Sequence, residues 1–387
     1  PVGVRSITRR ADPAPPRQDD APSTDSPHVH PYSRYRRLAA VLPIALIAAG
    51  CSRTEARPNE APAASSNEKA AARAMVALDS ASRNRQPNET GRIPILEYHL
   101  VGTREARWER EHTRFRRDLE LLYERGYRPI TVADLVSRRI DLPRGLSPVV
   151  FTFDDASPSQ FRYVERNGQL VVDSTSAVGI WLDFQKAHPD WESKATFCVL
   201  SGAEAGRAFF GDRDIEGQKS AWRHAKLKFL AERGFELCNH TLWHAQLSKY
   251  DDTVVQEQIA RLALAVDSAV PGYRVRTMAL PLGEWPRNEG LAAKGSWTDA
   301  RTKRVVAYDH AAVLLVAGQP VPSPFDPAFD PLRLERVQVY GNSLERTLDW
   351  LEKSGRRYVS DGDSTAITAA GVIVANAGTD GRQPSAP

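Results

Sequence analysis

Two short polar motifs contain residue types that bind metal ions and move protons. Asp154 and Asp155 follow an apolar run that begins at Val150, and His240 and His244 stand four residues apart further along the chain. Adjacent carboxylates at a strand end project in different directions, so one can bind a metal ion while the other handles a proton. Histidines at i and i+4 share one face of a helical turn. Asp155, His240 and His244 are therefore candidate ligands of a divalent cation with open positions for water and substrate.

Each motif alone also has an ordinary structural explanation. Two adjacent aspartates are frequent in solvated turns and at helix N-termini, where a carboxylate accepts backbone hydrogen bonds. A single pair of histidines is often structural. Only the combination of the two motifs in one chain indicates catalysis.

The elements that must position these motifs alternate between strand and helix. Strands are predicted at short β-rich apolar runs, and helices where apolar residues recur at helical spacing before a Gly or Pro. Such alternation favours a parallel α/β sheet or barrel, in which catalytic side chains collect at the carboxyl ends of the strands. The predicted strands are Ile93–Tyr98, Pro148–Phe153, Ala195–Leu200 and Phe235–Cys238, and the predicted helices are Thr113–Arg125, Lys226–Arg233 and Asp252–Val270.

With these motifs in this order, the chain resembles the polysaccharide deacetylase family, which is carbohydrate esterase family four and is also called the NodB-like homology domain. The resemblance extends from about Arg92 to Gly362. It implies an α/β fold, a distorted (β/α) barrel with seven strands. It rests on five segments, which are Pro94–His99 (PILEYH), Thr152–Asp155 (TFDD), Ala195–Phe197 (ATF), His240–His244 (HTLWH) and Ala279–Gly283 (ALPLG).

The resemblance implies a role for each residue of the two polar motifs. Asp154 would be the general base, and Asp155, His240 and His244 would hold the metal ion. The implied reaction is attack of water on an acetyl carbonyl, for which a dication and a neighbouring carboxylate supply the activation. Two histidines with one carboxylate favour Zn²⁺, while Co²⁺, Ni²⁺ or Mn²⁺ suit the same ligands.

The turn Pro281-Leu282-Gly283 departs from the family's usual Pro-Tyr-Gly. A main-chain donor survives this change, so the backbone N–H of Leu282 is expected to stabilise the oxyanion, whereas the side-chain wall of the substrate groove differs. Pro281 and Trp243 are expected to contact the substrate. The family's arginine that orients the base is assigned to Arg276, the nearest upstream arginine, with an ordinary surface arginine as the alternative.

The general acid is missing from its expected place. The segment Leu334–Val337 resembles the strand before the last family motif, where a histidine often serves as the acid, but no histidine follows it. His310 lies too early in the chain, so the acid stays unassigned.

The favoured function is removal of N-acetyl groups from N-acetylglucosamine units of an envelope or extracellular polysaccharide. The alternatives are a catalytically silent glycan-binding lipoprotein and an O-acetyl esterase.

The N-terminal region predicts export and membrane anchoring. Three arginines precede the apolar run Leu38–Ala49, which has the length of a signal-peptide core and is too short to span a membrane. Small residues before Cys51 resemble a lipobox, so Cys51 is expected to carry a lipid anchor and the protein to face the periplasm or the cell exterior. The predicted organisation is an unstructured leader with signal peptide at 1–51, a flexible tether at 52–91, the deacetylase domain at 92–363 and a flexible tail at 364–387.

Composition bounds the class of protein and its partners. The 387 residues are 41% apolar and 26% charged, the balance of a globular protein with a sizeable core. The net charge of +4 arises from 52 basic and 48 acidic residues without a basic stripe, so no nucleic-acid partner is expected. The expected partners are an acetylated polysaccharide and, through Cys51, a membrane. Cys198 and Cys238 fall on predicted strands that the resemblance implies are neighbours, and they are expected to be buried thiols rather than a disulfide.

Overall fold

The computed structural model describes residues 84–202, 208–364, 366–369 and 372–375. All of them belong to the second of two compact units, Pro62–Pro387. The predicted signal peptide and the lipid site at Cys51 lie outside the described residues. Within those ranges, no helix combines the length and the hydropathy of a membrane span.

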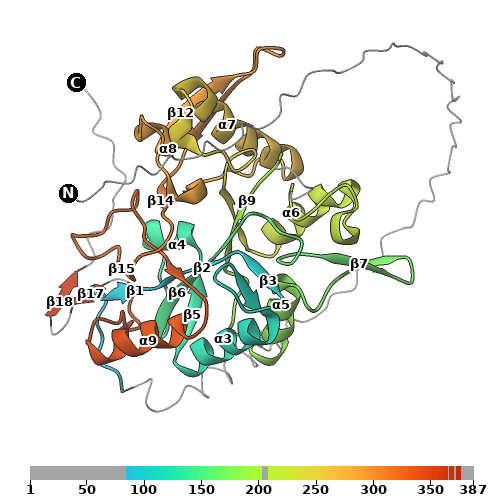
Figure 1. Cartoon of the computed structure of the whole chain (residues 1–387). Coiled ribbons are helices and arrows are strands. Elements are labelled where there is room, and N and C mark those ends of the chain that lie inside the picture. The colour runs from blue at the N-terminus through green and yellow to red at the C-terminus, as the bar shows by residue number, and fades with distance from the viewer. Residues whose placement is uncertain (1–83, 203–207, 365, 370–371, 376–387) are drawn as a thin grey trace, which may run out of the picture. The chain divides into compact units, whose positions relative to one another are not determined.

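A curled parallel sheet forms the centre of this unit (Figure 1). Seven strands follow one another in the order β14-β11-β10-β9-β6-β2-β16, and β5 pairs with the first half of β6 as an eighth. A parallel bridge between Leu314, in β14, and Leu334, just before β16, joins the two ends of this path. The predicted α/β fold, a distorted seven-stranded barrel, is confirmed. The strands are β2 (Ile95–Tyr98), β5 (Tyr127–Ile130), β6 (Ser147–Asp154), β9 (Thr196–Val199), β10 (Glu236–Asn239), β11 (Thr277–Ala279), β14 (Ala312–Leu314) and β16 (Val337–Gln338).

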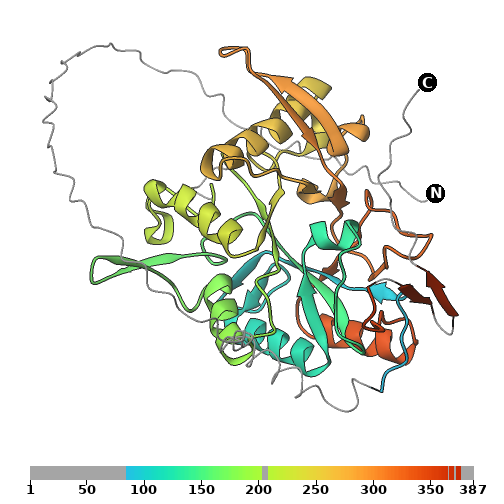
Figure 2. The ribbon, with the colours of Figure 1, turned by 180° about the vertical axis from the view of Figure 1, so that it is seen from behind.

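Helices cover the outer face of the sheet, as the two opposite views show (Figures 1 and 2). Apolar residues of five of them share one core cluster with outward-facing strand residues such as Phe151 and Phe197. The helices are α3 (His112–Glu124), α4 (Val132–Val136), α5 (Ala177–Ala187), α6 (Arg223–Glu232), α7 (Asp252–Ala269), α8 (Gly290–Ala293) and α9 (Ser343–Lys353).

Five two-stranded pairs lie beside the main sheet, and four single 3-10 turns complete the described elements. The pairs are β1 (Arg92–Ile93) with β15 (Val321–Pro322), β3 (Leu100–Gly102) with β4 (Glu109–Glu111), β7 (Tyr163–Arg166) with β8 (Gln169–Val172), β12 (Lys294–Thr298) with β13 (Val305–Asp309), and β17 (Ala366–Ala369) with β18 (Val372–Ala375); the 3-10 turns are η2 (Ile215–Gly217), η3 (Ser220–Trp222), η4 (Leu247–Lys249) and η5 (Pro281–Gly283).

Strand alternation decides which side chains enter the barrel. Ile95, Val150 and Cys238 belong to one core cluster, whereas their chain neighbours Leu96 and Phe151 belong to the other. Because successive side chains of a strand point to opposite faces, every second residue beyond these positions also faces inward. The same parity therefore directs Glu97, Asp154 and His240 into the barrel.

The predicted elements agree with the observed ones to within about three residues. Asn88 pairs with Val359, and Glu89 is buried, so ordered structure begins before the predicted border at residue 92. Within the predicted flexible tail, β17 and β18 pair as an antiparallel hairpin.

The expectation of two free thiols is corrected by the structure. Cys198 and Cys238 occupy opposite positions of the paired strands β9 and β10, with Cα atoms 4.1 Å apart, and they form a disulfide. Their side chains leave the sheet on the same face because directly opposed residues of neighbouring strands do so. The bond therefore links two strands that lie beneath the site described below.

Burial of one lysine predicts a pH-dependent stability. Lys226 on α6 is fully buried and donates to the carbonyl oxygen of Phe210. Burial, followed by the charge of Arg162, lowers the pKa of Lys226 to about 7. Between this value and the ordinary 10.5, the unfolded chain binds more protons than the folded chain, so the free energy of unfolding rises with pH. We expect Lys226→Met to lose this rise relative to the unmodified protein when chemical denaturation is measured at both ends of that window; an unchanged rise would contradict the assignment.

Candidate active site

The polar residues of the barrel gather where its strands end. Asp154 is the last residue of β6, and His240 directly follows β10. Tyr98 lies opposite Phe153 in the β2–β6 register, so His99 follows β2 next to Asp154. Because all strands of the main sheet run parallel, these carboxyl ends meet at one edge. The sequence motifs that are far apart in the chain are thereby brought to one place.

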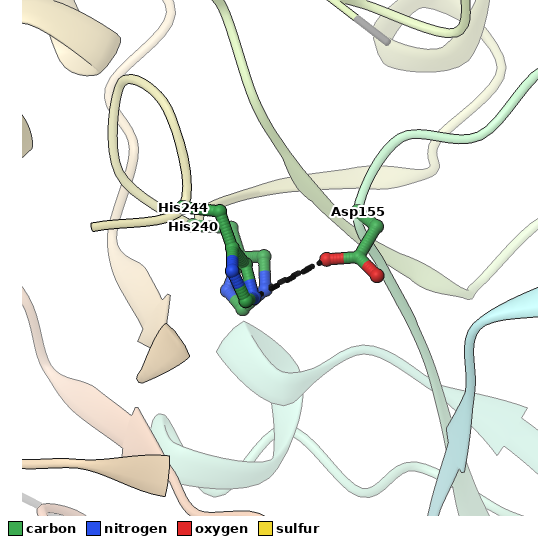
Figure 3. A group of neighbouring side chains, drawn as sticks. All are labelled: Asp155, His240 and His244. Carbon is green, nitrogen blue, oxygen red and sulfur yellow. Dashed lines mark ion pairs between the residues drawn. The ribbon is translucent and has the colours of Figure 1, made fainter. Parts of the chain in front are cut away.

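The three predicted metal ligands converge (Figure 3). Nε2 of His240 lies 3.3 Å from Oδ1 of Asp155, and Nε2 of His244 lies 3.5 Å from the same oxygen. The three ligand atoms all lie within 4.8 Å of one another. Ligands bound to zinc at the usual distances in a tetrahedron are separated by about 3.4 Å. The spacing therefore fits a small divalent cation held by Asp155, His240 and His244.

The hydrogen bonds of His240 also fit a metal ligand. Its Nδ1 lies 2.9 Å from the carbonyl oxygen of Ala279, which accepts a hydrogen bond and leaves the lone pair on Nε2. Nε2 is buried and has no hydrogen-bond partner among the described residues. A buried nitrogen without a partner is costly unless something binds it. A metal ion beside Asp155 would meet that need.

The protonation states of Asp155 and His244 suit cation binding, whereas burial lowers the pKa of His240 but the charges of Asp154 and Asp155 outweigh it and raise that pKa. Burial raises the pKa of Asp155, but the neighbouring His240 outweighs it and holds the pKa below its usual range, so the carboxylate is ionised. Burial, followed by the charge of His240, lowers the pKa of His244 to about 4, so its imidazole is neutral at neutral pH. Metal ions bind deprotonated carboxylates and neutral imidazoles.

The backbone at these residues is a turn rather than the predicted helical turn. Thr241 and His244 have positive φ angles of 68° and 65°, and Asp155 has one of 76°. Non-glycine residues in this region cost about 1 kcal/mol or more each and persist where the surrounding structure enforces them. The two histidines share a ligand position because of this turn and not because of helical spacing.

A buried arginine orients the predicted base. Nη1 and Nη2 of Arg336 donate to the two oxygens of Asp154 at 2.8 Å each, and Nη2 also lies 2.8 Å from Oε1 of Glu97. Burial raises the pKa of Asp154, but the charge of Arg336 outweighs it and holds the pKa below its usual value. Oδ2 of Asp154 lies 4.0 Å from Nε2 of His240. An ionised carboxylate is thus fixed beside the metal ligands.

The assignment of this orienting role to Arg276 is wrong. Arg276 is exposed and lines a separate groove between α7 and the β12/β13 hairpin. Arg336 instead enters the barrel next to β16, in the segment Leu334–Val337 after which the family's histidine is missing. The available signal was an arginine two residues after Leu334 in a segment expected to be a strand, because a guanidinium that such a strand buries needs carboxylate partners.

The site lies in a pocket of about 390 Å³. Leu282 belongs to its wall, has a φ of 59°, and its backbone N–H has no hydrogen-bond acceptor in the part of the chain that the structure describes. That free N–H suits the predicted oxyanion donor. Pro281 is buried and does not line the pocket, and Trp243 is exposed outside it. The pocket is lined by His99, Leu100, Trp108, Asp154, Asp155, His240, His244, Leu280, Leu282 and Val316.

His99 is a functional candidate that had no role in the sequence analysis. It lines the pocket, and it lies close to Asp154 and Glu97 in a second group of possible ligands. Its ring lies 4.6 Å from that of Trp108. The motif that ends in His99 was recognised only as an entry strand. Its imidazole is an ionisable group in the pocket that can supply the unassigned acid.

Trp108 replaces Trp243 as the aromatic wall of the pocket. Trp108 is 40% exposed, and the guanidinium carbon of Arg107 lies over its ring, 4.8 Å from the ring centroid. Stacking of a sugar on such a face contributes about 1 kcal/mol, so we expect Trp108→Ala to raise KM roughly fivefold. Trp243→Ala serves as the matched control and should leave KM unchanged. Equal effects of the two substitutions in steady-state kinetics would contradict this placement.

Comparison with known proteins relates this arrangement to a family. The sequence model described as polysaccharide deacetylase matches residues 143–295, a range that contains Asp154, Asp155, His240, His244 and Leu282. The comparison with curated proteins gave no match.

Similar solved structures include a Streptococcus pyogenes deacetylase, PplD, in complex with acetate (18% identity, 68% of this chain and 98% of that chain, TM-score 0.47). IcaB from Ammonifex degensii is similar at 18% identity, covering 69% of this chain and 100% of that chain, with a TM-score of 0.46. A polysaccharide deacetylase from Bacillus cereus, BC0361, is similar at 16% identity, covering 67% and 69%, also with a TM-score of 0.46. Residues 143–295, which contain most of the polar residues gathered at the barrel's edge, are thus similar to the polysaccharide deacetylase family.

Proposed function

We propose that this protein is a metal-dependent deacetylase that removes N-acetyl groups from N-acetylglucosamine units of an envelope or extracellular polysaccharide. The observation that carries the proposal is the convergence of Asp155, His240 and His244 beside the ionised Asp154 in one pocket. A base next to a cation-binding set is what hydrolysis of an unreactive amide requires.

Each residue of the pocket has a separate role in the proposed reaction. A metal ion held by Asp155, His240 and His244 would polarise the acetyl carbonyl and make water more acidic. Asp154 accepts a proton from the attacking water while Arg336 holds its carboxylate in place. The N–H of Leu282 donates to the carbonyl oxygen as negative charge develops there. His99 donates a proton to the departing nitrogen. It thereby acts as the general acid, the role of the family histidine that is missing after Leu334–Val337.

Loss of His99 should affect amide hydrolysis more than ester hydrolysis. An amine must be protonated to leave, whereas an alkoxide leaves more readily, so the acid matters more for N-acetyl groups. We expect His99→Gln to lower kcat on N-acetyl substrates by roughly 10²–10⁴-fold and to have a smaller effect on O-acetyl substrates. The exposed His224→Gln is the control. Unchanged kcat in His99→Gln, measured by acetate release, would remove this residue from the mechanism.

The proposed location and metal rest on separate observations. The apolar run Leu38–Ala49 and Cys51 favour export and lipid anchoring. The disulfide between Cys198 and Cys238 supports an oxidising compartment, because disulfides persist outside the cytosol. Two histidines and one carboxylate favour Zn²⁺ over harder cations. We therefore propose a zinc enzyme that faces the periplasm or the cell exterior.

The decisive experiment measures acetate released from N-acetylglucosamine oligomers by the purified protein after metal removal. Activity should disappear with the metal and return with Zn²⁺ at one ion per chain, as counted by elemental analysis. His240→Ala should bind little metal and stay inactive. If metal binds stoichiometrically but neither N-acetyl nor O-acetyl substrates release acetate, the protein is a glycan-binding protein and the proposal fails.

A further inference from the structure

A second groove lies apart from the catalytic pocket and shares no lining residue with it. It has a volume of about 490 Å³ and is bounded by α7, by the extended segment Tyr273–Arg276, and by the β12/β13 hairpin. In Figure 1 this hairpin and α7 lie together at the top of the ribbon. A volume of this size accommodates a ligand of a few sugar units.

The groove carries more positive than negative side chains. Four cationic residues line it, Arg274, Arg276, Lys294 and Arg304, against the carboxylates of Asp267 and Asp309. Arg304 pairs with Asp267 at 3.4 Å. The other three cationic side chains have no ion pair or side-chain hydrogen bond among the described residues. Positive charges that lie close together without ion-pair partners repel each other, so binding of an anionic ligand would be favourable here.

The spacing of the arginines suits an extended ligand. Arg274 and Arg276 are exposed, whereas Val275 between them is buried. In an extended segment, residues two apart point to the same side, about 7 Å from each other. Both guanidinium groups therefore face the groove, and each offers paired N–H donors that match a carboxylate or a phosphate.

The opposite wall offers apolar surface and backbone. Every residue from Arg304 to Asp309 lines the groove, and Val305 is 63% exposed. In the described structure, β13 pairs only with β12, so its other edge has no neighbouring strand. Outward N–H and C=O groups of such an edge can bind hydroxyls, and Val305 can contact the apolar face of a sugar ring.

We propose that this groove binds an acidic segment of a polysaccharide, with carboxylate or phosphate groups held by Arg274, Arg276 and Lys294. The choice of a glycan rests on the proposed function, because a polymeric substrate continues beyond the residue being deacetylated. The groove would hold a negatively charged stretch of that polymer away from the catalytic pocket. It adds affinity for acidic glycans without taking part in the reaction.

The test measures binding of a fluorescein-labelled oligoglucuronate to the full-length protein by fluorescence anisotropy at low ionic strength. We expect Arg274→Ala/Arg276→Ala to weaken binding at least tenfold, and added salt to weaken binding to the unmodified protein. The control is Arg138→Ala/Arg166→Ala, which removes two exposed arginines that have no ion pair among the described residues, one just after α4 and one at the end of β7. Asp154→Asn should bind oligoglucuronate as the unmodified protein does, so failure of this proposal and failure of the deacetylase proposal are distinguishable.

Three results would overturn the assignment. Absence of oligoglucuronate binding, or equal weakening in the two double variants, would show that the groove does not select acidic glycans. Equally tight and equally arginine-dependent binding of an oligoglutamate would indicate a site for acidic peptides. Binding to vesicles of anionic lipid, with none to oligoglucuronate, would indicate a membrane surface.

Discussion

Asp154→Asn is expected to lower kcat for acetate release by roughly 10²–10⁴-fold, because it removes the base that Arg336 holds beside the metal ligands. The amide has nearly the same size as the carboxylate but cannot accept the proton of the attacking water. Asp155, His240 and His244 are unchanged, so the bound metal should remain at one ion per chain. Elemental analysis alongside kinetics separates lost chemistry from lost metal.

The fold should tolerate this substitution. Arg336 contacts two carboxylates, so after the change it still pairs with Glu97 at 2.8 Å. The buried group then holds one positive and one negative charge. Asp190→Asn is the matched control, since Asp190 pairs with the buried Arg128 at 2.7 Å away from the pocket. If Asp154→Asn kept full kcat, or if Asp190→Asn lost as much activity, Asp154 would not be the base.

Arg336→Met is expected to be the most destabilising of these changes. The guanidinium is fully buried and contacts Asp154, Glu97 and the carbonyl oxygen of Leu315. Its loss leaves two buried carboxylates without a counter-charge, and breaking a buried ion pair in this way costs about 3–5 kcal/mol. Chemical denaturation should show that decrease in the free energy of unfolding.

The same substitution should also change catalysis in the fraction that folds. Arg336 holds the pKa of Asp154 below its usual value, so without it the carboxyl is protonated to higher pH. The acid limb of the pH profile of kcat should therefore move to higher pH. The loss of orientation should cost roughly 10–100-fold in activity at neutral pH, as for other residues that support a metal site.

Arg128→Met provides the comparison for Arg336→Met. It also removes a buried arginine from an ion pair, with Asp190, and should lower the free energy of unfolding. Its folded fraction should retain the kcat and the pH profile of the unmodified protein. Identical pH profiles for both variants would mean that Arg336 is only structural.

The sequence by itself determined the strand and helix order, the paired aspartates and the two histidines. These signals are local: β-rich runs end at Asp154 and before His240, and strand alternation decides which of these side chains face inward. A prediction from local pattern succeeds where neighbouring residues in the chain decide the conformation. The backbone donor expected at Leu282 came from the resemblance of the turn Pro281–Gly283 to a family motif.

Only the tertiary structure decided which distant residues complete the site. Arg336 reaches Asp154 because β16 lies beside β2 and β2 beside β6, a strand order that spacing in the chain does not encode. Trp108 and His99 enter the pocket for the same reason, whereas Arg276, much nearer to the histidine motif in sequence, lies in another groove. Cys198 and Cys238 bond because the β9–β10 register sets them opposite each other. Contacts between strands far apart in sequence depend on how the sheet closes, and the packing of the whole chain sets that closure.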